Sequence, residues 1–183
     1  MIIGLSGYAR SGKDTIADIL VKEHGFTQYS FAEPMKHAMY VLNPIVKSDK
    51  FGDFYYQQVV NAYGIDEAKV KFPEIRRLLQ VFGTEVGRDM FGENFWVDLC
   101  LNKAKADLIT ISDVRFPNEA DAIKARGGQV WRVDRSGIGP VTGHASETAL
   151  DGYKFDQILK NNGTLEELQE LVNRRIDWAN KNV

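Results

Sequence analysis

The N-terminal segment constrains the fold more than any other part of this sequence. An apolar run at residues 1–5 leads directly into GYARSGKDT, in which Gly7, Gly12 and Lys13 match the pattern G-x-x-x-x-G-K. Glycines at these positions let backbone N–H groups curl around a polyphosphate, and a helix start adds partial positive charge. Apolar residues at helical spacing over 14–24 complete the unit. The segment therefore predicts a strand, a phosphate-binding loop and a helix.

One position departs from the usual form of this loop. The serine or threonine that commonly follows the lysine is replaced by Asp14, and Thr15 comes next. A carboxylate is electrostatically favourable at a helix start, and it would bind a magnesium ion through water. The Thr15 hydroxyl would contact the metal directly. Both residues are candidate metal ligands, and the sequence does not decide between them.

Composition excludes several classes of protein. A length of 183 residues corresponds to one domain at about 150 residues per domain. The net charge of −2 argues against a binder of nucleic acid polymers or of membrane surfaces. A single cysteine excludes an internal disulfide framework and a four-cysteine zinc site. No apolar run reaches the roughly 18 residues of a membrane span, and no cleavable signal pattern is present, so we expect a soluble cytoplasmic protein.

Predicted strands and helices alternate along the chain. Strands are expected at 1–5, 26–31, 107–112, 129–133 and 155–159. This order predicts an α/β fold of three layers, a parallel five-stranded sheet with helices on both faces. We expect one domain over 1–183, with a core formed by 1–31 and 107–183, a helical insert at about 32–106 and a glycine-rich lid at about 135–152. Ligands of such sheets bind beyond the carboxyl ends of the strands.

A second candidate site follows the predicted strand at 107–112. Asp113 comes directly after that strand, where a phosphate-loop enzyme places its second acidic residue for Mg²⁺. Arg115 lies two residues further on and would bind a transferring phosphoryl group. The alternative is a surface ion pair. Because a phosphate loop accompanies this segment, a functional role is favoured.

Four stretches together resemble a known family: SGYARSGKDT, ISDVRFPNEADAI, HASET and FDQILKNNGTLEEL. They are similar to the deoxynucleoside monophosphate kinases of bacteriophages. The resemblance implies the nucleoside monophosphate kinase version of the P-loop NTPase fold. It also implies transfer of the γ-phosphoryl group of ATP, with Mg²⁺, to a deoxynucleoside 5′-monophosphate, which supplies nucleotides for DNA synthesis. The enzyme would act in the host cytoplasm if a phage encodes it.

The resemblance also assigns roles to residues. The matched phosphate-loop residues would bind ATP: Gly7, Arg10, Ser11, Gly12, Lys13, Asp14 and Thr15. Lys13, Asp113 and Arg115 would form the catalytic set. His144 and Glu147 match an H-x-S-E stretch without an assigned role, and zinc is not favoured there because no third ligand is visible.

Further candidates belong to the lid and to the acceptor side. Arg132 and Arg135 lie where this fold places its ATP-side lid, and they would stabilise transition-state charge or stack on adenine. The acceptor monophosphate binds in the insert, which offers Lys36, Arg77, Gln80, Arg88 and Trp96. Arg77, Gln80 and Arg88 share roughly one helix face, and arginine binds phosphate bidentately. The alternatives are a solvated helix face and, for Trp96, a core position.

Two other functions stay open. GKD is also similar to phosphomevalonate kinases, and NNGTLEEL is similar to dephospho-coenzyme A kinases, so another P-loop small-molecule kinase is an alternative. A regulatory module that binds a nucleoside triphosphate would show switch segments, whereas this chain has a basic, aromatic insert that suits a second substrate. The sequence leaves open which bases are accepted, whether ribonucleotides are excluded, and whether the chain forms a homodimer.

Overall fold

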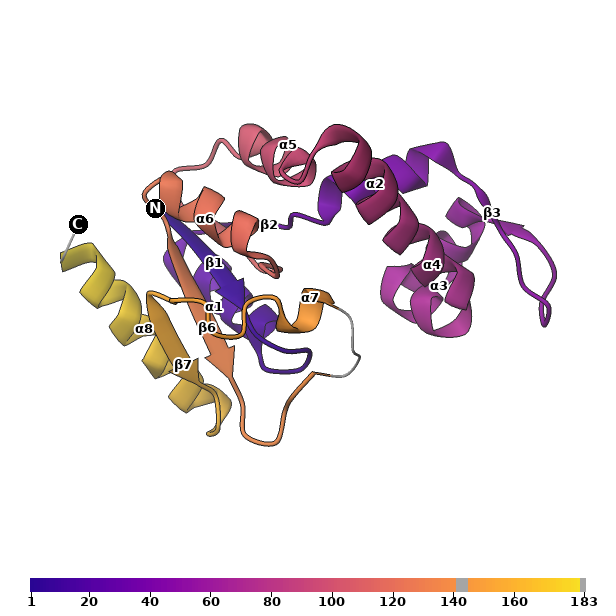
Figure 1. Ribbon diagram of the computed structural model, residues 1–183. Helices are drawn as coiled ribbons and strands as arrows, with labels where there is room; N and C mark the ends of the chain where they lie inside the picture. Colours follow the sequence, from indigo (N-terminus) through magenta and orange to yellow (C-terminus); the bar gives the residue numbers. More distant parts are fainter. Residues whose placement is uncertain (141–144, 182–183) are drawn as a thin grey trace. The chain divides into compact units, whose positions relative to one another are not determined.

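The computed structural model describes residues 1–140 and 145–181 (Figure 1). The chain divides into two compact units. The first, here called the sheet unit, comprises residues 1–30 and 102–183; the second, the helical unit, comprises Phe31–Leu101.

The sheet unit contains a five-stranded sheet in the order β2-β5-β1-β6-β7. The strands are β1 (Ile2–Ser6), β2 (Thr27–Tyr29), β5 (Ile109–Ile111), β6 (Gln129–Asp134) and β7 (Gln157–Lys160). Every neighbouring pair is parallel, and Gly4 at the centre is in register with Ile111 and Val130. The predicted parallel five-stranded sheet is therefore confirmed.

Helices cover both faces of this sheet (Figure 1). α1 (Lys13–His24) and α8 (Leu165–Lys181) share one apolar core with Ile3 and Leu5 of β1. Gly4 lies between those residues and faces the opposite side, because strand side chains alternate. There a Cβ on Gly4 would lie 2.6 Å from Ile123 of α6 (Pro117–Ala125). The glycine thus lets α6 pack closely against the second face.

The helical unit begins with α2 (Glu33–Leu42) and a two-stranded antiparallel hairpin, β3 (Ile45–Val46) and β4 (Phe54–Tyr55). α3 (Tyr56–Lys71) follows, with non-helical backbone at Gly64, and then α4 (Pro73–Val81) and α5 (Phe95–Lys103). Its core includes Tyr56, Phe72 and Ile75. The sequence predicted a helical insert, in which the aromatic-rich residues 51–64 were expected to be helical. The hairpin was missed because its strands are two residues long, too short for a recognisable alternation.

A π-helical segment, η1 (Phe82–Met90), continues α4 where the sequence predicted an ordinary helix. Two glycines within it meet neighbouring side chains. A Cβ on Gly83 would lie 2.6 Å from Met35 Sδ, and a Cβ on Gly87 would overlap the Trp96 indole. These glycines therefore permit close approach, and the groups that approach are side chains of the same unit.

Within residues 1–140 and 145–181, no helix is both long and apolar enough to cross a membrane. The same residues hold no group of three or more His, Cys, Asp or Glu side chains arranged to bind a metal ion. Part of the proposed lid, residues 141–144 with His144, lies outside the described residues.

Candidate active site

The phosphate loop joins β1 to α1 through backbone conformations that favour glycine. Gly7 has φ 142° and Gly12 has φ 105°. A Cβ on Gly7 would collide with the Val133 carbonyl oxygen of β6 and lie 2.8 Å from Ser11 Oγ. A Cβ on Gly12 would collide with the Asn161 amide. Both glycines of the motif are therefore required by tertiary contacts as well as by backbone angle.

Asn161 anchors this loop from the end of β7. Its side-chain amide donates a 2.8 Å hydrogen bond to the Ser11 carbonyl oxygen. Ser11 is only 1% exposed, and its hydroxyl has no hydrogen-bond partner among the described residues. A buried, unpaired hydroxyl is costly unless a ligand or water completes it, and a phosphate oxygen is a suitable partner. Asn161 carried no assigned role, although its place two residues after the last predicted strand was a usable signal.

The Lys13 ammonium group lies half-buried at the start of α1 and donates a 2.8 Å hydrogen bond to the Tyr8 carbonyl oxygen. Burial lowers the pKa of Lys13, the Asp14 carboxylate opposes this shift, and the nearby guanidinium groups of Arg115 and Arg132 reinforce it. A cation that is desolvated beside other cations gains most from an incoming anion. This electrostatic setting suits a polyphosphate.

Asp113 and Arg115 follow β5 at the same edge of the sheet. The Ser30 hydroxyl donates a 2.7 Å hydrogen bond to the Asp113 carboxylate. The side chain of Glu119 on α6 accepts hydrogen bonds from the backbone N–H groups of Arg115, at 2.7 Å, and Phe116, at 3.1 Å. Glu119 is 4% exposed. It therefore fixes the loop that carries Arg115, a role that the sequence reasoning did not assign.

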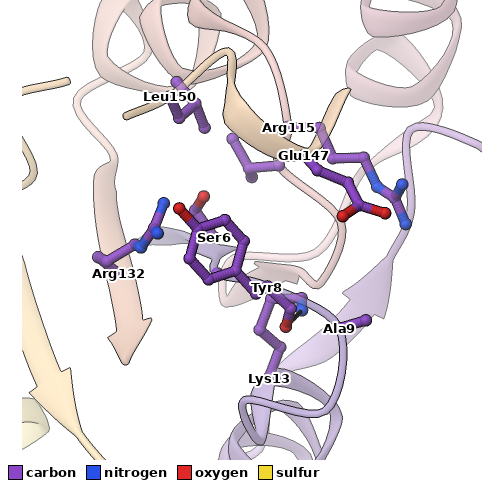
Figure 2. A pocket seen from close by; sticks show the side chains of 10 residues that line it. Ser6, Tyr8, Ala9, Lys13, Arg115, Arg132, Glu147 and Leu150 are labelled. Atoms are coloured by element: carbon purple, nitrogen blue, oxygen red, sulfur yellow. Dashed lines mark hydrogen bonds between the residues drawn. The ribbon is translucent and has the colours of Figure 1, made fainter. Parts of the chain in front are cut away.

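A pocket in the sheet unit brings several predicted residues together (Figure 2). Its lining includes Tyr8, Lys13, Arg115, Arg132 and Glu147. The phosphate loop, the segment after β5 and strand β6 all contribute to it. Predicted positions that are far apart in the sequence thus meet at the carboxyl ends of parallel strands. Arg135 is exposed and is not among the residues of this lining.

Arg132 has protein partners on several sides. Its guanidinium lies 4.5 Å from the centroid of the Tyr8 ring and 5.7 Å from that of Phe155. It pairs with Asp134 at 3.0 Å and with Asp151 at 3.5 Å, and its side chain is 10% exposed. These contacts support the phosphate loop, and a direct contact of Arg132 with ATP stays a prediction.

The geometry agrees with the sequence comparisons. The family model described as deoxynucleotide monophosphate kinase matches residues 1–72 and 57–172 of this chain. The chain belongs to this family. It is 34% identical to a putative deoxynucleotide monophosphate kinase of Acanthamoeba polyphaga mimivirus, over 99% of this chain and 98% of that protein. It is 28% identical to the deoxynucleotide monophosphate kinase of Enterobacteria phage T4, over 91% and 95% of the two chains.

A solved structure supports the fold. Shikimate kinase from Aquifex aeolicus matches with a TM-score of 0.56 at 15% identity over the full length of both chains. Sequence and fold together make this member of the deoxynucleotide monophosphate kinase family a P-loop phosphotransferase. The predictions of family, fold class and enzyme type are confirmed.

The acceptor candidates of this family member lie in the helical unit. Arg77 is held by Glu74 through two hydrogen bonds of 2.7 Å, and its side chain is 59% exposed. Gln80 is exposed on α4, Arg88 is half-buried on η1, and Lys36 lies on α2. The exposed ion pair of Arg77 matches the alternative of a solvated helix face.

Trp96 is a packing residue of the helical unit. It is 7% exposed, donates a 2.8 Å hydrogen bond to the Gly83 carbonyl oxygen, and contacts the rings of Phe82 and Phe95. Its contacts match the core alternative, because little of the ring is left for a nucleobase. Stacking of Trp96 on a base stays a prediction without support from these contacts.

The residues near the pocket suit magnesium. Asp113 and Asp14 supply carboxylates, and Thr15 supplies a hydroxyl on the first turn of α1. Oxygen ligands of this kind are what Mg²⁺ prefers, and it commonly keeps several waters. Glu147 adds a further carboxylate to the lining. The chemistry of these donors therefore fits a magnesium ion accompanying ATP, although Asp14, Thr15 and Asp113 are not among the residues that line the pocket.

Proposed function

We propose that this chain phosphorylates deoxynucleoside 5′-monophosphates with ATP, forming the diphosphate and ADP. One observation carries the mechanism: Lys13 of the phosphate loop and Arg115 of the segment after Asp113 line the same pocket (Figure 2). Membership of the deoxynucleotide monophosphate kinase family supports the choice of acceptor.

The chemistry is an in-line displacement at the γ-phosphorus of ATP. An oxygen of the acceptor monophosphate forms the new P–O bond, the bond to the β–γ bridging oxygen breaks, and ADP leaves with that electron pair. Backbone N–H groups of the phosphate loop and the Lys13 ammonium hold the β- and γ-phosphates. Arg115 offers charge to the transferring group, whose negative charge spreads over its oxygens in the transition state.

Magnesium would accompany ATP. Thr15, Asp14 and Asp113 are the residues that would hold it, directly or through water. When bound, the ion would neutralise phosphate charge. The Ser30 hydroxyl keeps the Asp113 carboxylate oriented.

The acceptor is assigned to the helical unit. Arg88, which is half-buried on η1, is the residue that we favour for its 5′-phosphate. Arg77 lies on an exposed helix face and is bound by Glu74. Gln80, exposed on α4, would contact a base edge, and Lys36 adds positive charge on α2. Action in the cytoplasm and assembly as a homodimer stay predictions.

An acceptor panel tests the proposal. The protein is incubated with Mg-ATP and, in separate reactions, each deoxynucleoside monophosphate, each ribonucleoside monophosphate, phosphomevalonate and dephospho-coenzyme A, and ADP is measured. We expect ADP formation with at least one deoxynucleoside monophosphate, far above the rate with ATP alone. Turnover with only phosphomevalonate or dephospho-coenzyme A would replace the proposed acceptor. ATP hydrolysis without any acceptor dependence would favour a regulatory module.

A further inference from the structure

The side chain of Tyr8, the second residue of the phosphate loop, forms a hydrogen bond with Asp151, a residue that is distant in the sequence. Its hydroxyl donates to both carboxylate oxygens of Asp151, at 2.9 and 3.0 Å. The two residues are 143 positions apart in sequence. Asp151 follows Leu150, which lines the pocket, and comes shortly after α7 (Ala145–Thr148), whose Glu147 also lines it. One hydrogen-bonded pair thus joins the phosphate loop to the opposite wall of the pocket.

Arg132 completes this arrangement from β6. Its guanidinium faces the Tyr8 ring at 4.5 Å and lies 3.5 Å from the same Asp151 carboxylate. The Tyr8 ring therefore contacts the Arg132 guanidinium, and the Tyr8 hydroxyl bonds to the Asp151 carboxylate. Arg132 and Asp151 also form an ion pair with each other. Figure 2 shows Tyr8 between Arg132 and the rest of the pocket. Such a closed set of contacts restricts both ring position and backbone position.

The backbone of Tyr8 matters because its carbonyl oxygen accepts the Lys13 hydrogen bond at 2.8 Å. We propose that Tyr8 and Asp151 are positioning residues for the phosphate loop. They hold the Tyr8 carbonyl in place, so that the Lys13 ammonium is aimed into the pocket, and they hold the wall that carries Glu147 and Leu150. This inference rests on the proposed use of ATP, and it adds two residues that the family motif does not include.

The sheet unit contains a matched control. Tyr153 donates a 2.7 Å hydrogen bond to Asp121, another exposed tyrosine–aspartate pair. A cation, Lys124, also lies over the Tyr153 ring at 4.8 Å. Neither Tyr153 nor Asp121 is among the residues that line the pocket. A comparison of Tyr8→Phe with Tyr153→Phe, each of which removes one hydroxyl, therefore separates a positioning effect from a general loss of stability.

The test compares Tyr8→Phe, Asp151→Ala, Asp151→Asn and Tyr153→Phe. Binding of ADP with Mg²⁺ and of a non-hydrolysable ATP analogue is measured by calorimetry, and melting temperatures are recorded beside it. We expect Tyr8→Phe and Asp151→Ala to weaken nucleotide binding by about threefold to tenfold, which is the range for loss of one ordinary hydrogen bond. Asp151→Asn keeps a carbonyl oxygen that accepts from Tyr8, so its loss should be smaller.

A combined variant gives a second criterion. Because Tyr8 and Asp151 act through one bond, the Tyr8→Phe, Asp151→Ala protein should bind nucleotide about as well as Asp151→Ala alone. Tyr153→Phe should bind nucleotide like the wild type, whatever its melting temperature. The inference is overturned if Tyr8→Phe binds nucleotide within twofold of the wild type, or if Tyr153→Phe loses as much affinity as Tyr8→Phe.

The two proposals fail in different ways. Nucleotide binding is measured without an acceptor, so a wild-type protein that binds ATP but phosphorylates no deoxynucleoside monophosphate refutes the proposed function and leaves the binding test of Tyr8 and Asp151 intact. Where turnover is present, the KM for ATP should rise in Tyr8→Phe while the KM for the acceptor stays within about twofold. An equal rise in both constants would contradict a role confined to the phosphate loop.

Discussion

The Ser30 hydroxyl donates a 2.7 Å hydrogen bond to the Asp113 carboxylate and joins the carboxyl ends of β2 and β5. A second bond between these strands runs from the Gln28 amide to the Ser112 hydroxyl at 2.9 Å. The carboxylate proposed to bind magnesium is thus oriented by a neighbouring strand. Ser30 is also the last residue of the sheet unit before the chain enters the helical unit.

Asp113→Asn should lower kcat strongly and shift the Mg²⁺ dependence to higher concentrations, because loss of one charge leaves the ion poorly held. Ser30→Ala should act in the same direction but more weakly, since it removes the orienting bond and keeps the carboxylate. Titration of activity with Mg²⁺ measures both effects. An unchanged titration in Asp113→Asn would reduce Asp113 to a structural residue.

Lys13→Ala should abolish phosphoryl transfer while the protein stays folded. The ammonium group is proposed to bind the phosphates and is not needed for packing, so its loss should cost several kcal/mol of transition-state stabilisation. Turnover and circular dichroism are measured on the same sample. A variant that retains more than about a tenth of the wild-type turnover would contradict the assignment.

The stability of the wild type should also depend on the Lys13 proton. Burial lowers the pKa of Lys13 below its ordinary value of 10.5, so the folded state binds this proton less tightly than the unfolded chain. The free energy of unfolding therefore gains a contribution as pH rises from the folded pKa towards 10.5. Denaturant titrations of the wild type and Lys13→Ala over this pH range should show the gain only in the wild type. Parallel curves of unfolding free energy against pH for the two proteins would rule out this contribution of Lys13.

Arg88→Ala and Arg77→Ala should differ. Arg88→Ala should raise the KM for the acceptor and leave the KM for ATP nearly unchanged. Arg77→Ala should change the acceptor KM by less than about threefold, because Arg77 is paired with Glu74 on an exposed helix face. It should cost at most about 1 kcal/mol of stability. A larger effect of Arg77→Ala than of Arg88→Ala on the acceptor KM would reverse the assignment.

Glu119→Ala should lower kcat and weaken stability together. The side chain of Glu119 accepts from the N–H groups of Arg115 and Phe116 while almost fully buried, so its removal leaves two donors without this partner. Glu119→Gln keeps a carbonyl acceptor of similar length and should retain most of the turnover. Loss of activity in Glu119→Gln equal to that in Glu119→Ala would indicate that the charge, and not the hydrogen bonding, is required. Kinetics and melting temperatures of the two variants make the comparison.

Local patterns predicted the sheet unit well. The phosphate loop and the apolar strands are encoded in contiguous residues, and the alternation of strands with helices implies parallel strands. The position of Asp113 at a strand end followed from the same pattern. The hairpin β3–β4 was missed, since strands of two residues leave little alternation to detect. Segment η1 was predicted as an ordinary helix, because the apolar spacing over residues 75–86 does not distinguish an α-helix from a π-helix.

The sequence by itself thus determined the fold class, the phosphate loop and the family, because each depends on residue types at fixed local spacing. Tertiary structure alone decided which predicted side chains already have partners. Arg77 is held by Glu74, Trp96 fills the space that Gly87 leaves, and Tyr8 meets Asp151 across the pocket. Apart from the Arg77–Glu74 pair, these contacts join residues on different elements. Within that pair, the sequence does not show whether Arg77 binds Glu74 or an acceptor phosphate. Side-chain partners are set by how elements pack, and no local pattern carries that information.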